Sequence, residues 1–161
     1  MEYGHGGDIY TYRDMLDFSV NVNPLGPSGK FIDAAKKGVE RAAQDPASRC
    51  RELRSALSEK KGIPEDCFLV GNGAADLFFS LVLAEKPKKA VIPVPAFSEY
   101  AHALRTVDCR IKEYILRREE QFTLTEDFLE CLKPETDMVF LCSHSNPAGR
   151  VISRERLCRI V

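Results

Sequence analysis

The second half of the chain repeats one pattern, in which a short apolar stretch is followed by a turn and then by an amphipathic segment. The apolar stretches predict strands at residues 67–70, 90–94, 110–116 and 138–142. Strands that alternate with helices need crossover connections, and such connections make neighbouring strands parallel. The pattern therefore predicts the α/β class, with a mainly parallel sheet and flanking helices.

The expected helices lie between these strands and before them. Helical spacing of apolar residues predicts helices up to Lys86, over 98–106 and 125–132, and after Ser153. Two earlier helices are expected, one capped by Ser28 and one over 48–61. Residues 1–30 are rich in Gly, Pro and Asn and lack such spacing. They predict an N-terminal arm, so the expected division is an arm over 1–30 and an α/β domain over 31–161.

Charge and composition argue against several classes of protein. The net charge is −1, and the absence of a dense Lys/Arg block argues against a nucleic-acid partner. The longest apolar run, near residues 77–84, is too short to span a bilayer, and the first residues hold no apolar leader. Six cysteines are scattered without a CxxC pair, which favours reduced thiols over disulfides or a metal site. A cytoplasmic protein is expected, without a membrane partner.

The stretch Gly71–Asp76, GNGAAD, stands where a strand passes into a helix. Free N–H groups and the positive end of a helix dipole make such a turn suitable for a phosphate. The glycines allow a close backbone approach and positive φ angles. The alternative is a tight turn without a ligand. Neither GxxxxGK[ST] nor GxGxxG is present, so these two nucleotide-binding motifs are excluded.

Two further candidates follow later strands. Phe97 comes after residues 90–94, at the sheet edge where ligands of parallel sheets gather, and could stack on a flat ring. The alternative is a core position, which we expect for Tyr100. Asn146 lies in the turn Ser-Asn-Pro-Ala-Gly after the fourth strand and can offer its amide to a phenolate oxygen. Cys142 and His144 have no further ligands at metal-site spacing.

In this combination the chain resembles the class I and II aminotransferases of fold type I, and most closely their histidinol-phosphate aminotransferase and threonine-phosphate decarboxylase branch. The resemblance implies pyridoxal 5'-phosphate (PLP) as cofactor. Backbone N–H groups of the turn would bind its phosphate, the aromatic would stack on its ring, and the asparagine would bond the ring oxygen. The implied residues are Gly73, Ala74, Ala75, Phe97 and Asn146.

The arm and the loop Ser145–Gly149 around Asn146, called the asparagine loop below, carry the rest of the resemblance. Its threonine-phosphate decarboxylase members, which belong to cobalamin synthesis, hold the substrate phosphate with arm residues, which implies His5 and Asn23. The alternative for both is capping and turn formation. The loop departs from the usual Asn-Asn-Pro-Thr-Gly through Ser145 and Ala148, and from a preceding proline through His144. The Asn146 contact is unaffected.

The catalytic groups of the family would lie beyond this loop. They are the Schiff-base lysine, an acid against the ring nitrogen and an arginine for the substrate carboxylate. No lysine follows Lys133, so no catalytic residue is assigned and the chain alone is expected to be inactive. The intact protein would be a homodimeric transaminase or decarboxylase of a small, phosphorylated amino acid.

The resemblance also predicts the sheet. The family's seven strands lie in the order 3-2-4-5-6-7-1, so the last three strands expected here would lie side by side as 3-2-4. The first would stand apart without its neighbour, which invites self-association, rearrangement or loose packing. The last expected helix has barely formed its second turn at Val161, which we take as the sign of a truncated chain.

Two rival functions remain open at this point. One is a self-contained α/β module that binds a phosphate or a nucleotide. The other is an interaction protein without catalysis. Equilibrium binding of nucleotides compared with PLP separates the first rival from a PLP enzyme.

Overall fold

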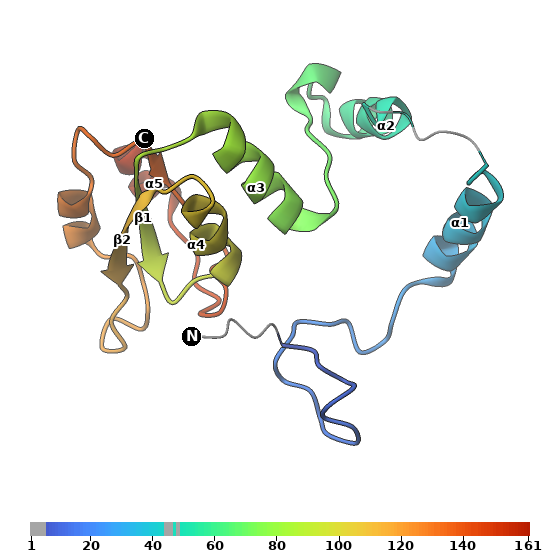
Figure 1. Ribbon diagram of the computed structural model, residues 1–161, viewed down its shortest axis with the longest axis horizontal. Coiled ribbons are helices and arrows are strands. Elements are labelled where there is room, and N and C mark those ends of the chain that lie inside the picture. The colour runs from blue at the N-terminus through green and yellow to red at the C-terminus, as the bar shows by residue number, and fades with distance from the viewer. Residues whose placement is uncertain (1–5, 44–46, 48) are drawn as a thin grey trace. The chain divides into compact units, whose positions relative to one another are not determined.

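The computed structural model describes residues 6–43, 47 and 49–161. The chain forms two compact units, Met1–Phe68 and Leu69–Val161 (Figure 1). The division between an arm over 1–30 and a domain over 31–161 stays a prediction. Among the described residues, no helix is long and apolar enough to cross a membrane.

The first unit contains helices α1 (Gly29–Glu40) and α2 (Arg51–Lys61) and the 3-10 turn η1 (Glu65–Cys67). Ser28 caps α1, because its Oγ accepts a hydrogen bond from the N–H of Phe31 at 3.3 Å. Both helices were predicted from their apolar spacing, although α2 begins three residues later than expected. Neither helix contains a buried residue.

The strand predicted at residues 67–70 is wrong. Cys67 ends η1, with its N–H bonded to Pro64 O at 3.0 Å, and residues 68–70 belong to no strand. A short apolar stretch becomes a strand only when a neighbour accepts its backbone hydrogen bonds. The three strands of the sheet pair only with one another, so these residues have no such neighbour.

The sheet lies in the second unit and contains β1 (Lys89–Val94), β2 (Arg110–Ile115) and β3 (Met138–Val139). The spatial order is β2-β1-β3 and both pairings are parallel. Since these are the second, third and fourth strands expected from the sequence, the predicted order 3-2-4 is confirmed. β3 is shorter than predicted, but the N–H of Phe140 still bonds Val91 O at 3.2 Å.

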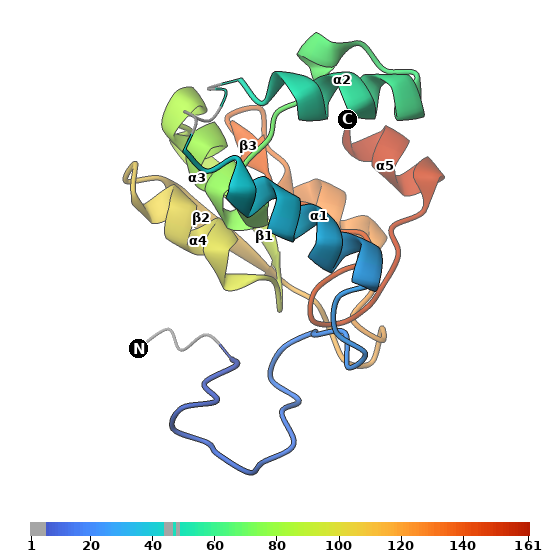
Figure 2. The same ribbon diagram turned by 90° about the vertical axis from the view of Figure 1, so that its right-hand side faces the viewer.

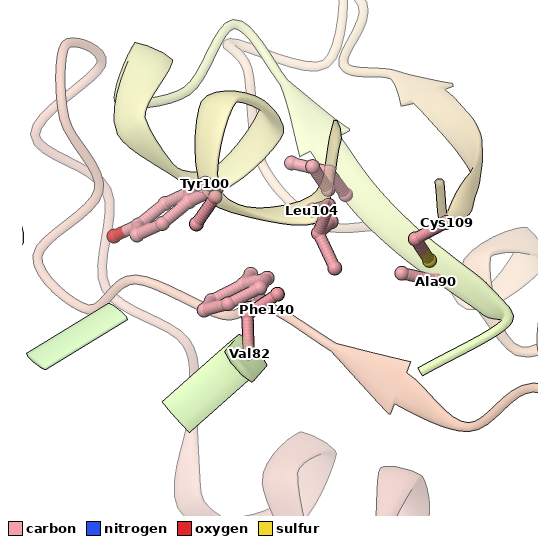
Figure 3. Close-up of a cluster of buried hydrophobic side chains, with 8 residues drawn as sticks. Val82, Ala90, Tyr100, Leu104, Cys109 and Phe140 are labelled. Carbon is pink, nitrogen blue, oxygen red and sulfur yellow. The ribbon is translucent and has the colours of Figure 1, made fainter. Parts of the chain in front are cut away.

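Helices α3 (Gly73–Glu85) and α4 (Ser98–Arg105) cover one face of the sheet. Alternate residues of β1, Ala90 and Ile92, point into this layer, as the two-residue period of a strand requires. Figure 3 shows the resulting cluster, in which the rings of Tyr100 and Phe140 face each other. The remaining buried members are Val82, Ala103, Leu104 and Cys109.

The opposite face is covered by the 3-10 turn η2 (Glu126–Cys131) and by α5 (Arg154–Ile160) (Figure 2). The helix predicted over 125–132 is therefore present as a tighter 3-10 turn. Ser153 caps α5 as expected, accepting from the N–H of Arg156 at 3.2 Å. The buried residues of this layer are Val91, Tyr114, Leu116, Leu124 and Phe128.

A carboxylate at the start of η2 makes the stability of this layer depend on pH. Hydrogen bonds from Thr125 and then from Tyr114 lower the pKa of Asp127 to about 2, with Arg117 contributing. Because this pKa is below the unfolded value, the stabilisation is present above about pH 4 and is lost as the pH falls toward 2. We expect Asp127→Asn to lower the midpoint of thermal unfolding at pH 7. Between pH 4 and 2, the midpoint of this variant should decrease less than that of the wild type.

Thermal unfolding followed by circular dichroism across this pH range measures the effect. Glu119→Gln, at an exposed position of the same unit, is the matched control and should leave the wild-type pH profile in place. An Asp127→Asn profile that parallels the wild type through this window would contradict the assignment.

Candidate functional site

The predicted phosphate turn opens α3. Gly73, the first residue of the helix, has φ +83°, and its N–H bonds Gly71 O at 2.9 Å. The Asn72 side chain makes no capping hydrogen bond, and no atom lies within 4 Å of the place where a Gly73 Cβ would stand. The first N–H groups of a helix lack partners within it, so this open end can accept an anion.

Asp76 determines the shape of the same turn. Its Oδ2 accepts the N–H of Asn72 at 2.9 Å, and a Cβ on Gly71 would lie 2.8 Å from that oxygen. Glycine at position 71 therefore leaves room for the carboxylate. The sequence analysis did not foresee this contact, although an acid four residues after Asn72 is a signal for it.

The aromatic candidate Phe97 lies just before α4 and is half-buried. Its ring meets Phe78 of α3 edge-on, with centroids 6.3 Å apart, and Tyr100 with centroids 5.9 Å apart. Phe97 thus packs against the core between α3 and α4, which is the alternative to ring stacking that the sequence left open. Tyr100 is buried, which confirms the core position expected for it. Ring stacking by Phe97 stays a prediction.

A partly open pocket with about 440 Å³ of empty space lies at the carboxyl ends of the strands. Asn146 lines it together with Ala96, the neighbour of Phe97, so two of the predicted ligand segments meet here. Arg150 is its only charged lining residue. The other lining residues are Pro93, Pro95, Tyr100, Leu116, Phe122, Leu124, Phe140, Cys142, Ser145, Val151 and Ile152.

Tyr100 presents a neutral hydroxyl beside this pocket. Burial raises its pKa well above the ordinary value, and a hydrogen bond with Cys142 acts in the same direction. Cys142 also contacts the carbonyl oxygen of His144, at 3.1 Å. Within the described ranges, no three His, Cys, Asp or Glu side chains gather closely enough to hold a metal ion.

The asparagine loop is closed at its base by Ser145 and Arg150. The N–H of Ser145 donates to Arg150 O at 2.8 Å, and the N–H of Arg150 donates to Ser145 Oγ at 2.9 Å. Arg150 Nε also donates to Gln121 O at 2.7 Å. Ser145, a departure from the usual family loop, is thus the residue that holds Asn146 at the pocket. The sequence analysis missed Arg150.

The arm residues belong to the first unit. The Oδ1 of Asn23 accepts the N–H of Leu25 and its Nδ2 donates to Gly26 O, both at 3.0 Å. These bonds fit the turn-forming alternative, and a role in substrate binding stays a prediction. His5 lies outside the described residues.

Solved structures define the class of fold. The chain superposes on L-threonine-O-3-phosphate decarboxylase from Porphyromonas gingivalis with a TM-score of 0.70 and 22% identity, covering 83% of this chain and 40% of the other. It superposes on an aromatic aminotransferase from Pyrococcus horikoshii with a TM-score of 0.71 and 25% identity, covering 86% and 40%. The chain thus has part of the fold of the fold type I PLP-dependent transferases.

Sequence comparison defines the family. The profile of "Aminotransferase class I and II" matches residues 13–161, so the chain belongs to that family. It is 33% identical to threonine-phosphate decarboxylase of Salmonella typhimurium, over 95% of this chain and 44% of that protein. It is 34% identical to histidinol-phosphate aminotransferase of Methanosarcina mazei, over 92% and 41%. The chain spans less than half the length of these relatives.

The family implies PLP, and the residues present fit two parts of that cofactor. The open start of α3 at Gly73 supplies N–H donors of the kind that a phosphate needs. Asn146 at the pocket supplies an amide for a ring oxygen. These donors come from elements of one unit.

Proposed function

We propose that this chain is the part of a PLP-dependent enzyme that binds the cofactor phosphate and contacts its ring. The observation that carries the proposal is the uncapped start of α3, with positive φ at Gly73 and open space around it. A doubly charged phosphate is stabilised there by backbone N–H groups and by the helix dipole. The asparagine loop also supports the proposal, because Asn146 lines the pocket at the carboxyl ends of the strands.

Each proposed residue has one role. The N–H groups of Ala74 and Ala75 bind the phosphate, and the N–H of Gly73 joins them by exchanging its bond with Gly71 O for one with the phosphate. Asn146 bonds the ring oxygen, and Phe97 lies against the ring. When bound, PLP withdraws electrons from the bonds at the substrate's α-carbon, which is the chemistry that amino-group transfer and decarboxylation require. The protein's part is to fix the position of that ring.

For the substrate, we propose a phosphorylated amino acid such as threonine phosphate, with His5 and Asn23 near its phosphate. Support comes from the relatives, which are a threonine-phosphate decarboxylase and a histidinol-phosphate aminotransferase. None of the ten lysines follows Lys133. We therefore propose that this chain alone holds PLP without a covalent bond and does not turn over substrate.

Calorimetric titration with PLP and with pyridoxal, which lacks the phosphate, tests the proposal. We expect PLP to bind at least about tenfold more tightly, because one charge-assisted hydrogen bond contributes about 1.5–3 kcal/mol. Gly73→Val should abolish most of this preference, since a β-branched residue is strained at φ +83° and the turn must change shape.

Gly38→Val is the matched control, because the space around Gly38 in α1 is equally open and its φ is not positive. The control should keep the wild-type preference, with circular dichroism confirming that every variant is folded. Equal affinities for PLP and pyridoxal would refute the proposal. Tighter binding of ADP than of PLP would favour the rival nucleotide module.

A further inference from the structure

A second hollow with charged walls lies at the amino ends of the strands. Lys89 of β1 is paired with Arg110 of β2, and Val91 is paired with Lys112. Paired residues of parallel strands, and residues two apart on one strand, project on the same face of the sheet. Val91 is buried in the layer under η2, so the three basic residues project on that face as well.

The segment after η2 forms the other wall of this hollow. Cys131, Lys133, Glu135 and Thr136 line it opposite the strands, around about 580 Å³ of empty space. The hollow lies away from the candidate cofactor pocket, because it contains the beginning of β1 whereas that pocket contains Pro93 near its end.

Positive charge dominates the lining. Four of its residues are basic, namely Lys89, Arg110, Lys112 and Lys133, and only Glu135 is acidic. Glu135 is already engaged, since its Oε1 lies 3.4 Å from Lys89 Nζ. Its own backbone N–H, followed by the charges of Lys89 and Lys133, lowers its pKa.

The neighbouring Asp137 acts mainly on Lys89 and Lys88, because the backbone N–H groups of these two residues, and then their charges, lower its pKa. Its Oδ2 accepts the backbone N–H groups of Lys88 and Lys89, at 2.8 and 2.9 Å. Gathered like charges repel one another, and a bound anion relieves this repulsion. The chain as a whole carries a net charge of −1, so the basic character is local to this hollow.

We propose that the hollow of Lys89, Arg110, Lys112 and Lys133 binds a small, multiply charged phosphate compound. Arg110 supplies a planar guanidinium that matches phosphate oxygens, and the lysines supply point charges around it. The site is an open hollow between two strands and the segment after η2, and its four basic residues surround a space of the size of a small anion. This inference does not depend on the cofactor site.

Calorimetry with sodium pyrophosphate as the probe tests the inference on the whole chain. We expect saturable binding with one pyrophosphate in the hollow, and at least a tenfold loss of affinity in the double variant Arg110→Gln/Lys112→Gln. Without ligand, the same variant should unfold at an equal or higher temperature than the wild type, because it relieves repulsion. The double variant Lys36→Gln/Lys37→Gln in α1 changes the net charge equally and should keep the wild-type affinity.

Amide NMR during the same titration locates the bound anion. Shifts at Ala90, Val91 and Lys112 are the expected result, whereas shifts confined to Gly73–Ala75 would overturn the inference. An equal loss in the α1 control would show a general charge effect and would overturn it as well. Citrate that binds more tightly than pyrophosphate would exclude phosphate as the preferred ligand.

Discussion

Replacement of Phe128 by alanine is expected to lower the free energy of unfolding by about 3–5 kcal/mol. Phe128 is 1% exposed and is the only buried residue of η2. Its ring meets Tyr114 of β2 edge-on, with centroids 5.2 Å apart. The substitution leaves a cavity and removes the main contact that holds η2 on the sheet. Small domains are stable by only about 5–15 kcal/mol, so this loss is a large part of the total.

Urea unfolding followed by far-ultraviolet circular dichroism measures the change. Ile115→Ala is the control, because Ile115 is an apolar residue of the neighbouring strand that is 63% exposed. Ile115→Ala should lower the free energy of unfolding by less than about 1 kcal/mol, because an exposed side chain contributes little buried surface. Phe128→Leu should lower the free energy of unfolding by an amount between those of Phe128→Ala and Ile115→Ala. This variant allows the comparison even if the alanine variant does not fold. Similar losses for Phe128→Ala and Ile115→Ala would contradict the packing described here.

Tyr100→Ala is expected to cost a similar amount, about 3–5 kcal/mol, on the opposite face of the sheet. The ring is stacked on Phe140 with centroids 4.7 Å apart, and it meets Phe78 edge-on at 4.8 Å. These contacts join α3, α4 and the residue that follows β3, so the loss would loosen the wall of the candidate pocket as well as the core.

Tyr100→Phe separates the ring from its hydroxyl. The variant keeps all ring contacts and loses only the hydrogen bond with Cys142, so we expect a cost of about 1 kcal/mol. Chemical unfolding of both variants gives the comparison. If Tyr100→Phe proved as damaging as Tyr100→Ala, the hydroxyl rather than the ring packing would hold this layer together.

The elements that the sequence predicted correctly depend on local signals. Ser28 and Ser153 cap α1 and α5 as expected, because a capping hydrogen bond spans only three residues. The strand at 67–70 was predicted wrongly because an apolar stretch does not reveal whether a partner strand exists. The order of the other three strands came from the family resemblance and was confirmed.

In the candidate site, too, only the features that depend on local signals could be predicted. The turn at Gly73 could be inferred, since glycine and a strand-to-helix junction are visible in the sequence. The closure of the asparagine loop by Ser145 and Arg150, and the tether of Arg150 to Gln121, join residues whose proximity only the fold creates. For the same reason, the sequence did not show that Phe97 packs edge-on against Phe78.

The central claim is that the start of α3 binds the phosphate of PLP. The most direct test is a two-dimensional amide NMR titration of the isotopically labelled chain with PLP, with pyridoxal as the reference. We expect the signals of Gly73, Ala74 and Ala75 to shift with PLP and not with pyridoxal. Unchanged signals at these three residues under saturating PLP, or equal shifts with pyridoxal, would contradict this claim.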